Sequence, residues 1–303
     1  MQKHSLLLTG GTGFLGSIIK PLLERDYMVK TLGQSPGNDY CTDLSVTGDL
    51  ILPGKFNVVV HAAGKTRNDS GTATENLEFR RINYNGTLKL CNALEGNPPD
   101  CFIFISSVAV YGCGEGKNIS ESHPLNACSH YGKSKVLAEE FLTGWCRKYH
   151  TNLVILRPSL ILGANSTGNL EAMISGIRKG RYFSIGGGKA EKSFVLAENI
   201  ADVIPLVHSR NKSGIYNICN TNSVTFRDLE SIISRQLKCR MPLNIPLWMA
   251  KLLACAGNLF GDNAPINYSK LQKITNDLTF SNKKIRNELD WTPKELSNDY
   301  KLI

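Results

Sequence analysis

The order of hydrophobic and polar residues in the first half of the chain predicts strands that alternate with helices. Short apolar runs typical of buried strands occupy residues 5–9, 28–32, 57–61, 101–106 and 152–156. Apolar residues at helical spacing follow the first run from Phe14 and recur over residues 82–94 and 131–149. Such alternation builds βαβ units, so we expect an α/β fold with a doubly wound parallel sheet.

The pattern loosens after about residue 160, where turn-forming residues interrupt shorter apolar runs. We therefore expect a sheet domain over residues 1–160, with a returning segment near 195–218. A smaller, mixed C-terminal substrate domain is expected over residues 161–194 and 219–303.

Two segments of this pattern need an interpretation of their own. The apolar stretch over residues 245–260, with Lys251 in its middle, is either a membrane-surface helix or part of the core of the smaller domain. We favour the core. Pro21 lies inside the first predicted helix, where a proline removes a hydrogen bond, and we expect a kink there.

The composition is that of an ordered globular protein, because 42% of the 303 residues are hydrophobic. The longest uncharged stretch, the 16 residues between Lys3 and Lys20, contains four glycines and is too short for a membrane span. The N-terminal sequence lacks the cleavage region of a signal peptide. We expect a cytoplasmic protein with no membrane partner.

The nine cysteines are odd in number and form no C-x-x-C pair. Several lie inside apolar runs, such as Cys101 in CFIFIS. We interpret them as reduced thiols of the core and expect no metal site.

The 35 basic and 26 acidic residues leave a net charge of +9, which suits nucleic acid, a membrane surface or a small anionic ligand. The densest basic groups, residues 178–181 and 283–286, are short, separated and not interleaved with aromatic residues. Nucleic acid is therefore disfavoured as a partner.

A glycine-rich loop, GGTGFLG at residues 10–16, follows the first strand and opens the first helix. Glycines allow a tight turn and a close approach to a pyrophosphate, which the amide groups of the helix N-terminus can bind. By itself the loop could also be a structural turn. In this context it indicates a dinucleotide site of the Rossmann type.

The end of the second strand bears on which dinucleotide binds. An acidic residue at this position hydrogen-bonds the adenosine ribose of NAD. Here Gly33, Gln34 and Ser35 follow the strand and none is acidic. A 2′-phosphate would not be repelled, so we expect NAD(P), with NADP mildly favoured.

Candidate catalytic residues lie after the fourth apolar run and at the start of the next helix. Tyr131 and Lys135 are four residues apart and share one helix face. The pKa of a free tyrosine is near 10, and a nearby lysine with an oxidised nicotinamide favours the phenolate, which can move a proton. Ser107 follows a strand and precedes Tyr131 by 24 positions.

In this order, the glycine loop, Ser107, Tyr131 and Lys135 resemble the extended short-chain dehydrogenase/reductase family of the NAD-dependent epimerase/dehydratase type. The resemblance implies that Ser107 orients the substrate, Tyr131 transfers a proton and Lys135 also holds the nicotinamide ribose. It further implies cofactor contacts, together with Tyr131 and Lys135, from Gly10, Thr12, Gly13, Phe14, Leu15, Gly16, Gln34, Ser35, Asp43, Leu44, Ala62, Ala63, Gly64, Asn83 and Ser159. We interpret His61, which precedes this Ala-Ala-Gly turn, as a structural residue and not a catalytic one.

The residues after Ser107 narrow the reaction. Related 4,6-dehydratases place an acid and a base there, whereas this chain has Val108 and Ala109, so dehydration is disfavoured. The pattern is most similar to reductases of UDP-4-keto-6-deoxy-N-acetylhexosamines. The first hypothesis is therefore reduction of a 4-keto nucleotide sugar at C4 with Tyr131 as proton donor, and the alternative is a UDP-sugar 4-epimerase with tightly bound NAD.

The smaller domain resembles the nucleotide-binding part of these enzymes. Asn169 and Leu170 match a segment that receives the nucleotide, and Lys192 matches an arginine that contacts the pyrophosphate. Ser107 and Val108 complete the expected substrate contacts. A nucleotide-diphosphate sugar would then account for part of the positive charge.

Three further interpretations stay open. A dinucleotide-sensing regulatory protein would keep the fold, although such proteins often lose the tyrosine or the lysine. Reduction of a steroid-like ketone is disfavoured by the nucleotide segment. A homodimer could form through the helices that carry Asn83 and Tyr131.

Overall fold

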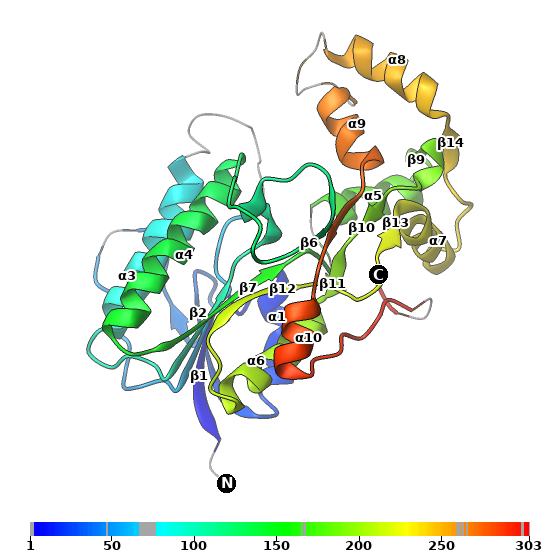
Figure 1. Ribbon diagram of the computed structural model, residues 1–303. Helices are drawn as coiled ribbons and strands as arrows, with labels where there is room; N and C mark the ends of the chain where they lie inside the picture. Colours follow the sequence, from blue (N-terminus) through cyan, green and yellow to red (C-terminus); the bar gives the residue numbers. More distant parts are fainter. Residues whose placement is uncertain are drawn as a thin grey trace.

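The computed structural model describes residues 3–46, 48–66, 77–164, 166, 168–258, 261, 264, 266–297 and 300–302. In this part of the chain a seven-stranded parallel sheet has the strand order β12-β7-β5-β4-β1-β2-β3 (Figure 1). Its strands are β1 His4–Thr9, β2 Tyr27–Gly33, β3 Tyr40–Cys41, β4 Val58–His61, β5 Cys101–Ile105, β7 Asn152–Pro158 and β12 Gly214–Ile218. The doubly wound parallel sheet predicted from the sequence is confirmed, and β12 returns to it from the second half of the chain.

Alternate residues of the strands face two separate cores. Leu6 and Leu8 of β1 pack in one core, and Leu7 packs in the other. The first core is covered by α1 Phe14–Leu23, α6 Ala197–Ser209 and α10 Lys283–Leu289. The second is covered by α3 Gly86–Leu94 and α4 His130–Lys148, and the π-helical turn η1 Arg80–Asn85 directly precedes α3. Helices therefore cover both faces of the sheet (Figure 1).

The remaining strands form small mixed sheets beside the large one. A four-stranded sheet has the order β13-β10-β15-β6, with β10 and β13 antiparallel. Two further pairs of parallel strands are β11-β8 and β14-β9. The strands are β6 Gly116–Ile119, β8 Leu160–Leu162, β9 Phe183–Ile185, β10 Glu191–Lys192, β11 Phe194–Leu196, β13 Val224–Thr225, β14 Leu243–Ile245 and β15 Leu278–Phe280. The mixed region is as expected, while the exact domain division stays a prediction.

The helices of this region complete the fold. They are α5 Asn169–Arg178, α7 Phe226–Gln236, α8 Leu247–Gly257 and α9 Tyr268–Thr275, with short 3-10 turns η2 Val108–Tyr111 and η3 Gly186–Gly188. Helices α8 and α9 lie at the far corner from the large sheet (Figure 1). Within the described residues, no helix combines the length and the apolar character that crossing a membrane requires.

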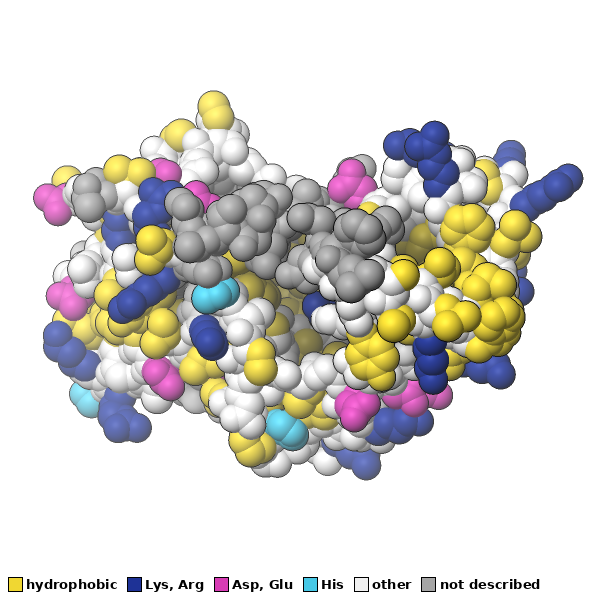
Figure 2. All heavy atoms as spheres, turned by 90° about the horizontal axis from the view of Figure 1, so that it is seen from above, with side chains coloured by type: hydrophobic (Ala, Val, Ile, Leu, Met, Phe, Trp, Pro, Cys, Tyr) yellow, Lys and Arg dark blue, Asp and Glu magenta, His cyan; other side chains and the backbone are white. Residues whose placement is uncertain are grey.

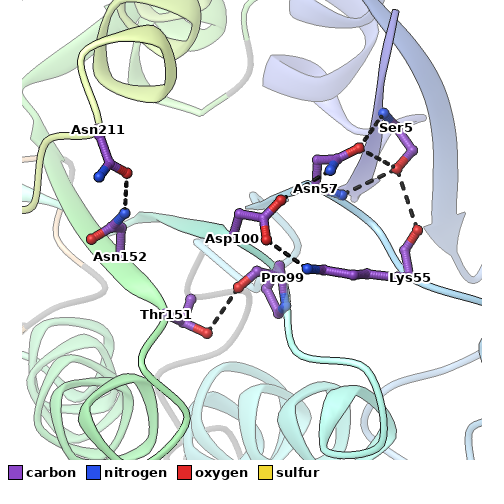
Figure 3. A network of polar contacts seen from close by, with 8 residues as sticks. All are labelled: Ser5, Lys55, Asn57, Pro99, Asp100, Thr151, Asn152 and Asn211. Carbon is purple, nitrogen blue, oxygen red and sulfur yellow. Dashed lines mark hydrogen bonds and ion pairs between the residues drawn. The ribbon is translucent and has the colours of Figure 1, made fainter.

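The amino ends of the central strands are held by a polar network (Figure 3). Asn57 accepts from the Ser5 amide at 3.0 Å and donates to Asp100 at 2.9 Å. Lys55 pairs with Asp100 at 2.6 Å, and both side chains are about half exposed. The network ties together the starts of β1, β4 and β5. It lies at the opposite edge from the strand ends that carry the candidate catalytic residues.

Helix α1 continues through Pro21 and ends at Leu23. The proline is exposed and lies in the last turn, where only one intrahelical hydrogen bond is lost. The kink expected there stays a prediction. The N-cap of α10 is Asn282, and the hydroxyl of the preceding Ser281 accepts from the Lys283 amide at 3.3 Å.

The expectation that all nine cysteines belong to the core is wrong for three of them. Cys91, Cys101, Cys146 and Cys219 are buried as expected, but Cys41, Cys128 and Cys255 are exposed. Cys41 lies on the edge strand β3 and Cys255 on the outer side of α8, so neither faces a core.

The interpretation of residues 245–260 as core is also wrong for most of α8. Only one narrow side of this helix, with Ala250 and Ala254, packs inward against Leu271 of α9. Trp248 and Leu252 are 63% and 64% exposed. The large apolar side chains of α8 therefore point away from the protein.

Candidate active site at the carboxyl edge of the sheet

The glycine loop after β1 is packed too tightly for side chains at two positions. Gly10 has a φ of +73°, and a Cβ there would lie 2.9 Å from the Ala63 Cα. A Cβ on Gly16 would lie 2.0 Å from the Gly10 carbonyl oxygen. In the described structure no side chain caps α1 at Gly13, so its first amides stay available. These features fit a bound pyrophosphate, with Thr12, Phe14 and Leu15 in the same loop.

Asn38 is a residue of this site that the sequence did not reveal. It is buried beside the loop and donates to the Ser35 carbonyl at 2.8 Å and weakly to the Thr12 hydroxyl at 3.4 Å. Its Oδ1 has no hydrogen-bond partner among the described residues. The sequence feature connected with this residue is Gly33, because a Cβ there would lie 2.9 Å from the side-chain nitrogen of Asn38. A free buried acceptor here fits a ribose hydroxyl.

Two carboxylates near the end of β2 are already engaged. Asp39 pairs with Lys30 at 2.8 Å and accepts from the Thr31 amide at 2.8 Å; although burial raises its pKa, these hydrogen bonds hold the pKa at about 2. Asp43 accepts from the Ser45 amide at 2.7 Å, and this and other hydrogen bonds outweigh burial to lower its pKa.

Of the other residues expected at the adenosine end, Gln34 and Ser35 are exposed at the end of β2, within reach of solvent and ligand. Leu44 is buried in the core beneath α3, so its side chain faces away from the loop and only its backbone can contribute.

The turn after β4 lies between the glycine loop and α4. The Ala63 amide donates to the Thr9 hydroxyl at 3.0 Å, and Ala62 packs against the first core. A Cβ on Gly64 would lie 2.9 Å from Asn83 Oδ1 and 3.5 Å from Lys135 Nζ. Small residues are thus required where the backbone passes Lys135.

His61 is held on both ring nitrogens. Nδ1 lies 2.7 Å from the Thr9 hydroxyl and Nε2 lies 2.9 Å from the Thr87 hydroxyl. Burial, with a smaller effect of Lys135, lowers its pKa to about 3. These contacts agree with a structural role.

Asn83 connects the β4 turn to the start of α4. Its amide group accepts from the Lys65 amide at 2.7 Å and donates to the Ser134 hydroxyl at 2.9 Å. Ser134 in turn donates to the Tyr131 carbonyl at 2.7 Å. Asn83 is buried and its side chain is engaged by these protein groups, so its geometry suits positioning of Tyr131 better than direct contact with a dinucleotide.

The structure brings Ser107, Tyr131 and Lys135 together. Ser107 follows β5 and caps η2 by accepting from the Ala109 amide at 3.2 Å. Ser129 caps α4, which places Tyr131 in the first turn, where the Ser107 side chain lies close enough to act on the pKa of the Tyr131 hydroxyl. Lys135 Nζ lies 6.0 Å from the centre of the Tyr131 ring and donates to the Ile105 carbonyl at 2.8 Å.

Burial controls the protonation of both groups. It raises the pKa of Tyr131, with the side chain of Ser107 acting in the opposite direction. It lowers the pKa of Lys135 to about 8, against the charge of Glu139. The sequence suggested that Lys135, together with an oxidised nicotinamide, favours the phenolate of Tyr131. In the protein without the cofactor, the raised pKa keeps Tyr131 as a neutral phenol. A neutral phenol suits Tyr131 as a proton donor.

A buried ion pair connects α4 to strand β7 of the large sheet, and the sequence did not reveal it. Arg157 of β7 contacts Glu139 through two nitrogens, at 3.0 and 2.5 Å, and Ser106 donates to the same carboxylate at 2.5 Å. Arg157 also donates to the Tyr111 hydroxyl at 3.1 Å. The signal available was spacing, since Glu139 is one turn beyond Lys135 on α4. The pair fixes the helix that carries both catalytic candidates.

Ser159, which was expected to contact the cofactor, is buried, and its amide donates to the Ile218 carbonyl at 3.0 Å. The residues expected to contact the substrate do not gather at one place. Val108 is half-buried directly after Ser107. Leu170 packs in a core, so only its backbone can contact a ligand, and the side chain of Asn169 lies outside the described residues. Lys192 donates to the Asn276 carbonyl at 2.7 Å, and burial lowers its pKa.

Comparison with known proteins places this arrangement in a family. Residues 6–219 match the model of the "NAD dependent epimerase/dehydratase family". The N-acetyl-α-D-glucosaminyl-diphospho-ditrans,octacis-undecaprenol 4-epimerase of Escherichia coli O157:H7 is 30% identical over 82% of this chain and 78% of its own length. UDP-glucose 4-epimerase of Vibrio cholerae is 27% identical over 96% of this chain and 91% of its own.

A solved structure shows the same fold over nearly the whole length. It is RMD from Pseudomonas aeruginosa complexed with NADPH, with a TM-score of 0.72, 20% identity, and coverage of 98% of this chain and 95% of that one. The chain belongs to the NAD dependent epimerase/dehydratase family and is an enzyme of the extended short-chain dehydrogenase/reductase type.

Proposed function

We propose that this enzyme oxidises and reduces C4 of a hexose carried on a diphosphate, with NAD(P). The observation that carries the proposal is the group of Ser107, Tyr131 and Lys135, joined to apolar residues at 108 and 109. Proton transfer at one oxygen needs a single acid, and Tyr131 supplies it. Elimination of water would need a further acid and base, which Val108 and Ala109 cannot provide.

The residues of the chain have separate roles in this reaction. A bound nicotinamide supplies or accepts the hydride at C4. Ser107 orients the C4 oxygen by hydrogen bonding, and Tyr131 gives that oxygen a proton or takes one from it. Lys135 holds a positive charge in a buried site, 6.0 Å from the centre of the Tyr131 ring, where it would stabilise negative charge that develops on the phenol oxygen during proton transfer.

Epimerisation at C4 is the form of this chemistry that the relatives favour, since two of them are named as 4-epimerases. Tyr131 would remove the proton of the C4 hydroxyl as C4 is oxidised. It would return the proton after the keto sugar has rotated to present its other face for reduction. The same residues serve both half-reactions. This was the alternative interpretation of the sequence.

Reduction of a 4-keto sugar is the second candidate, and Gly33 favours it. Without an acidic residue at the end of β2, a 2′-phosphate is tolerated, and the structural neighbour is complexed with NADPH. Asn38 instead favours NAD, because its free Oδ1 fits the 2′-hydroxyl of that cofactor. The cofactor therefore discriminates between the two forms.

An incubation with and without added NADPH tests the proposal. An epimerase converts a UDP-N-acetylhexosamine into its C4 epimer without added cofactor, and NAD copurifies with it. A reductase consumes NADPH, measured by nicotinamide absorbance, only with a UDP-4-keto-6-deoxyhexosamine. Tyr131→Phe should abolish either reaction. Absence of both reactions, with these sugars and with a polyprenyl-diphosphate N-acetylhexosamine, would overturn the proposal.

The group beyond the diphosphate distinguishes two substrate classes. The Vibrio cholerae relative is named for a UDP-sugar, whereas the Escherichia coli relative is named for a sugar on a diphosphate of undecaprenol, a polyprenyl lipid. Both classes present a hexose joined to a diphosphate.

A further inference from the structure

One corner of the smaller region exposes a group of large apolar side chains. They come from β9, β14 and α8, and we call them the apolar corner: Phe183, Leu243, Trp248, Met249, Leu252 and Leu253. Each is at least 40% exposed, and Leu243 reaches 73%. Figure 2 shows a continuous hydrophobic cluster on this side of the molecule. Contiguous apolar surface of this kind marks an interaction site.

Helix α8 is built so that its bulky residues cannot serve the protein's own core. Its inward side carries Ala250 and Ala254, which pack on Leu271 of α9. Its outward side carries Trp248 and Leu252 on one turn. A helix that stabilised the fold by burial would show the reverse distribution.

The charged residues near the apolar corner in the sequence are mostly positive. Residues 236–276 contain five Lys or Arg and one acidic residue. Three more basic residues immediately precede β9. Those exposed in the structure are Arg178, Lys179, Arg181, Lys238, Arg240, Lys251 and Lys273. In Figure 2, dark blue side chains lie around the margin of the hydrophobic cluster, with magenta ones at its lower edge.

This combination favours an anionic bilayer surface over a second copy of the chain. A two-fold dimer would bring the same basic margin against itself, and like charges repel. A membrane with acidic lipids instead attracts the margin, while Trp, Leu and Met enter the headgroup region. We propose that the apolar corner docks this enzyme on the surface of an anionic membrane.

The position of the apolar corner suits the catalytic site. Ser107 follows β5 and therefore lies at the carboxyl edge of the large sheet, with Tyr131 in the first turn of α4 beside it. The strands of this sheet run upward in Figure 1, so Figure 2 looks down on this edge, and the hydrophobic cluster is visible from the same side. This inference rests on the proposed function: an enzyme docked on a membrane would act on a hexose that a polyprenyl diphosphate holds at the same membrane. The proposal replaces the expectation of no membrane partner.

The test is binding to vesicles in the absence of any substrate, so failure of the proposed function does not affect it. The protein should cosediment with phosphatidylglycerol/phosphatidylethanolamine vesicles, and less so as salt is raised. Vesicles of phosphatidylcholine alone should bind it weakly. Trp145 and Trp291 are buried, so a blue shift of tryptophan emission on binding would come from Trp248.

A matched pair of variants makes the test specific. Trp248→Ser/Leu252→Ser should weaken vesicle binding by about tenfold or more. Met28→Ser/Ile51→Ser removes two exposed apolar side chains elsewhere and should leave binding unchanged. No binding by the folded wild type, or equal binding by both variants, would overturn the proposal. So would a wild-type dimer that the first variant dissociates, because a second copy would then cover the corner.

Discussion

The carboxyl edge of the sheet and the apolar corner both depart from the usual distribution of residues, in opposite directions. At the sheet edge, Lys135, Glu139 and Arg157 are charged and at most 4% exposed. At the corner, Trp248 and Leu252 are apolar and more than 60% exposed. Charged residues are seldom buried without a partner, and large apolar groups are seldom exposed together.

The two regions differ in whether the fold itself supplies a partner for these unusual side chains. Arg157 and Glu139 satisfy each other, and Lys135 donates to the Ile105 carbonyl, so the fold itself compensates the buried charges. On α8 the inward side is already filled by alanines, and the outward side has no such compensation in the described structure. Loss of a buried charge at the sheet edge should therefore damage folding, whereas changes at the corner should spare it.

Loss of the Tyr131 hydroxyl should have the largest effect on activity. Tyr131→Phe keeps the ring in its place but removes the proton carrier, and kcat should fall by about 10²–10⁴-fold. The unfolding temperature should stay close to that of the wild type. A variant that retains more than a tenth of the wild-type kcat would show that another group moves the proton.

Breaking the buried ion pair should have the largest effect on stability. Glu139→Ala leaves Arg157 as an uncompensated buried charge, so the free energy of unfolding should drop by about 3–5 kcal/mol in denaturant titrations. Lys55→Met breaks the exposed pair of Figure 3 and should cost at most about 1 kcal/mol. Equal losses in the two variants would contradict the distinction between them.

The alkaline limb of the activity should report Lys135. Because burial lowers its pKa to about 8, kcat/KM of the free enzyme should decline above that pH, and Lys135→Arg should move the decline to higher pH. A profile that is flat to pH 10 would argue against a role for this charge.

Stability should change in the opposite direction over the same range. Between pH 8 and the ordinary lysine pKa of 10.5, the unfolded chain binds more protons at residue 135 than the folded one. The free energy of unfolding of the wild type should therefore rise with pH relative to Lys135→Met. Denaturant titrations at pH 7.5 and 10 compare the two proteins.

The smallest effect is expected at the corner. Trp248→Ser should change the free energy of unfolding by no more than about 0.5 kcal/mol, since the side chain is mostly in solvent. Ile233→Ala, at a fully buried position in the same region, should cost about 2–5 kcal/mol. A large loss for Trp248→Ser would show that this residue belongs to the fold.

The parts predicted correctly from the sequence are those encoded by local patterns. Strand-helix alternation, the glycine loop and the spacing of Tyr131 and Lys135 each depend on neighbours in the chain, and the structure shows the corresponding elements. Ser107 joins them because parallel strands end at one edge of a sheet.

The features that were missed depend on contacts between distant segments. Asn38 acquires its place only when the turn after β2 folds over the glycine loop, and Arg157 meets Glu139 only when β7 lies beneath α4. Hydrophobic character alone could not tell which side of α8 faces α9. An apolar helix has the same composition whether its large residues point inward or outward.

The most direct test of the central claim is the fate of C4, followed by NMR. Wild-type enzyme and Tyr131→Phe are incubated with UDP-N-acetylglucosamine, a polyprenyl-diphosphate N-acetylglucosamine and a UDP-4-keto-6-deoxyhexosamine, with and without NADPH. The wild type should change the configuration or the oxidation state at C4 alone in at least one of these sugars, and the variant should not. Loss of water across C5 and C6, or an unchanged C4 in all of them, would contradict the proposed function.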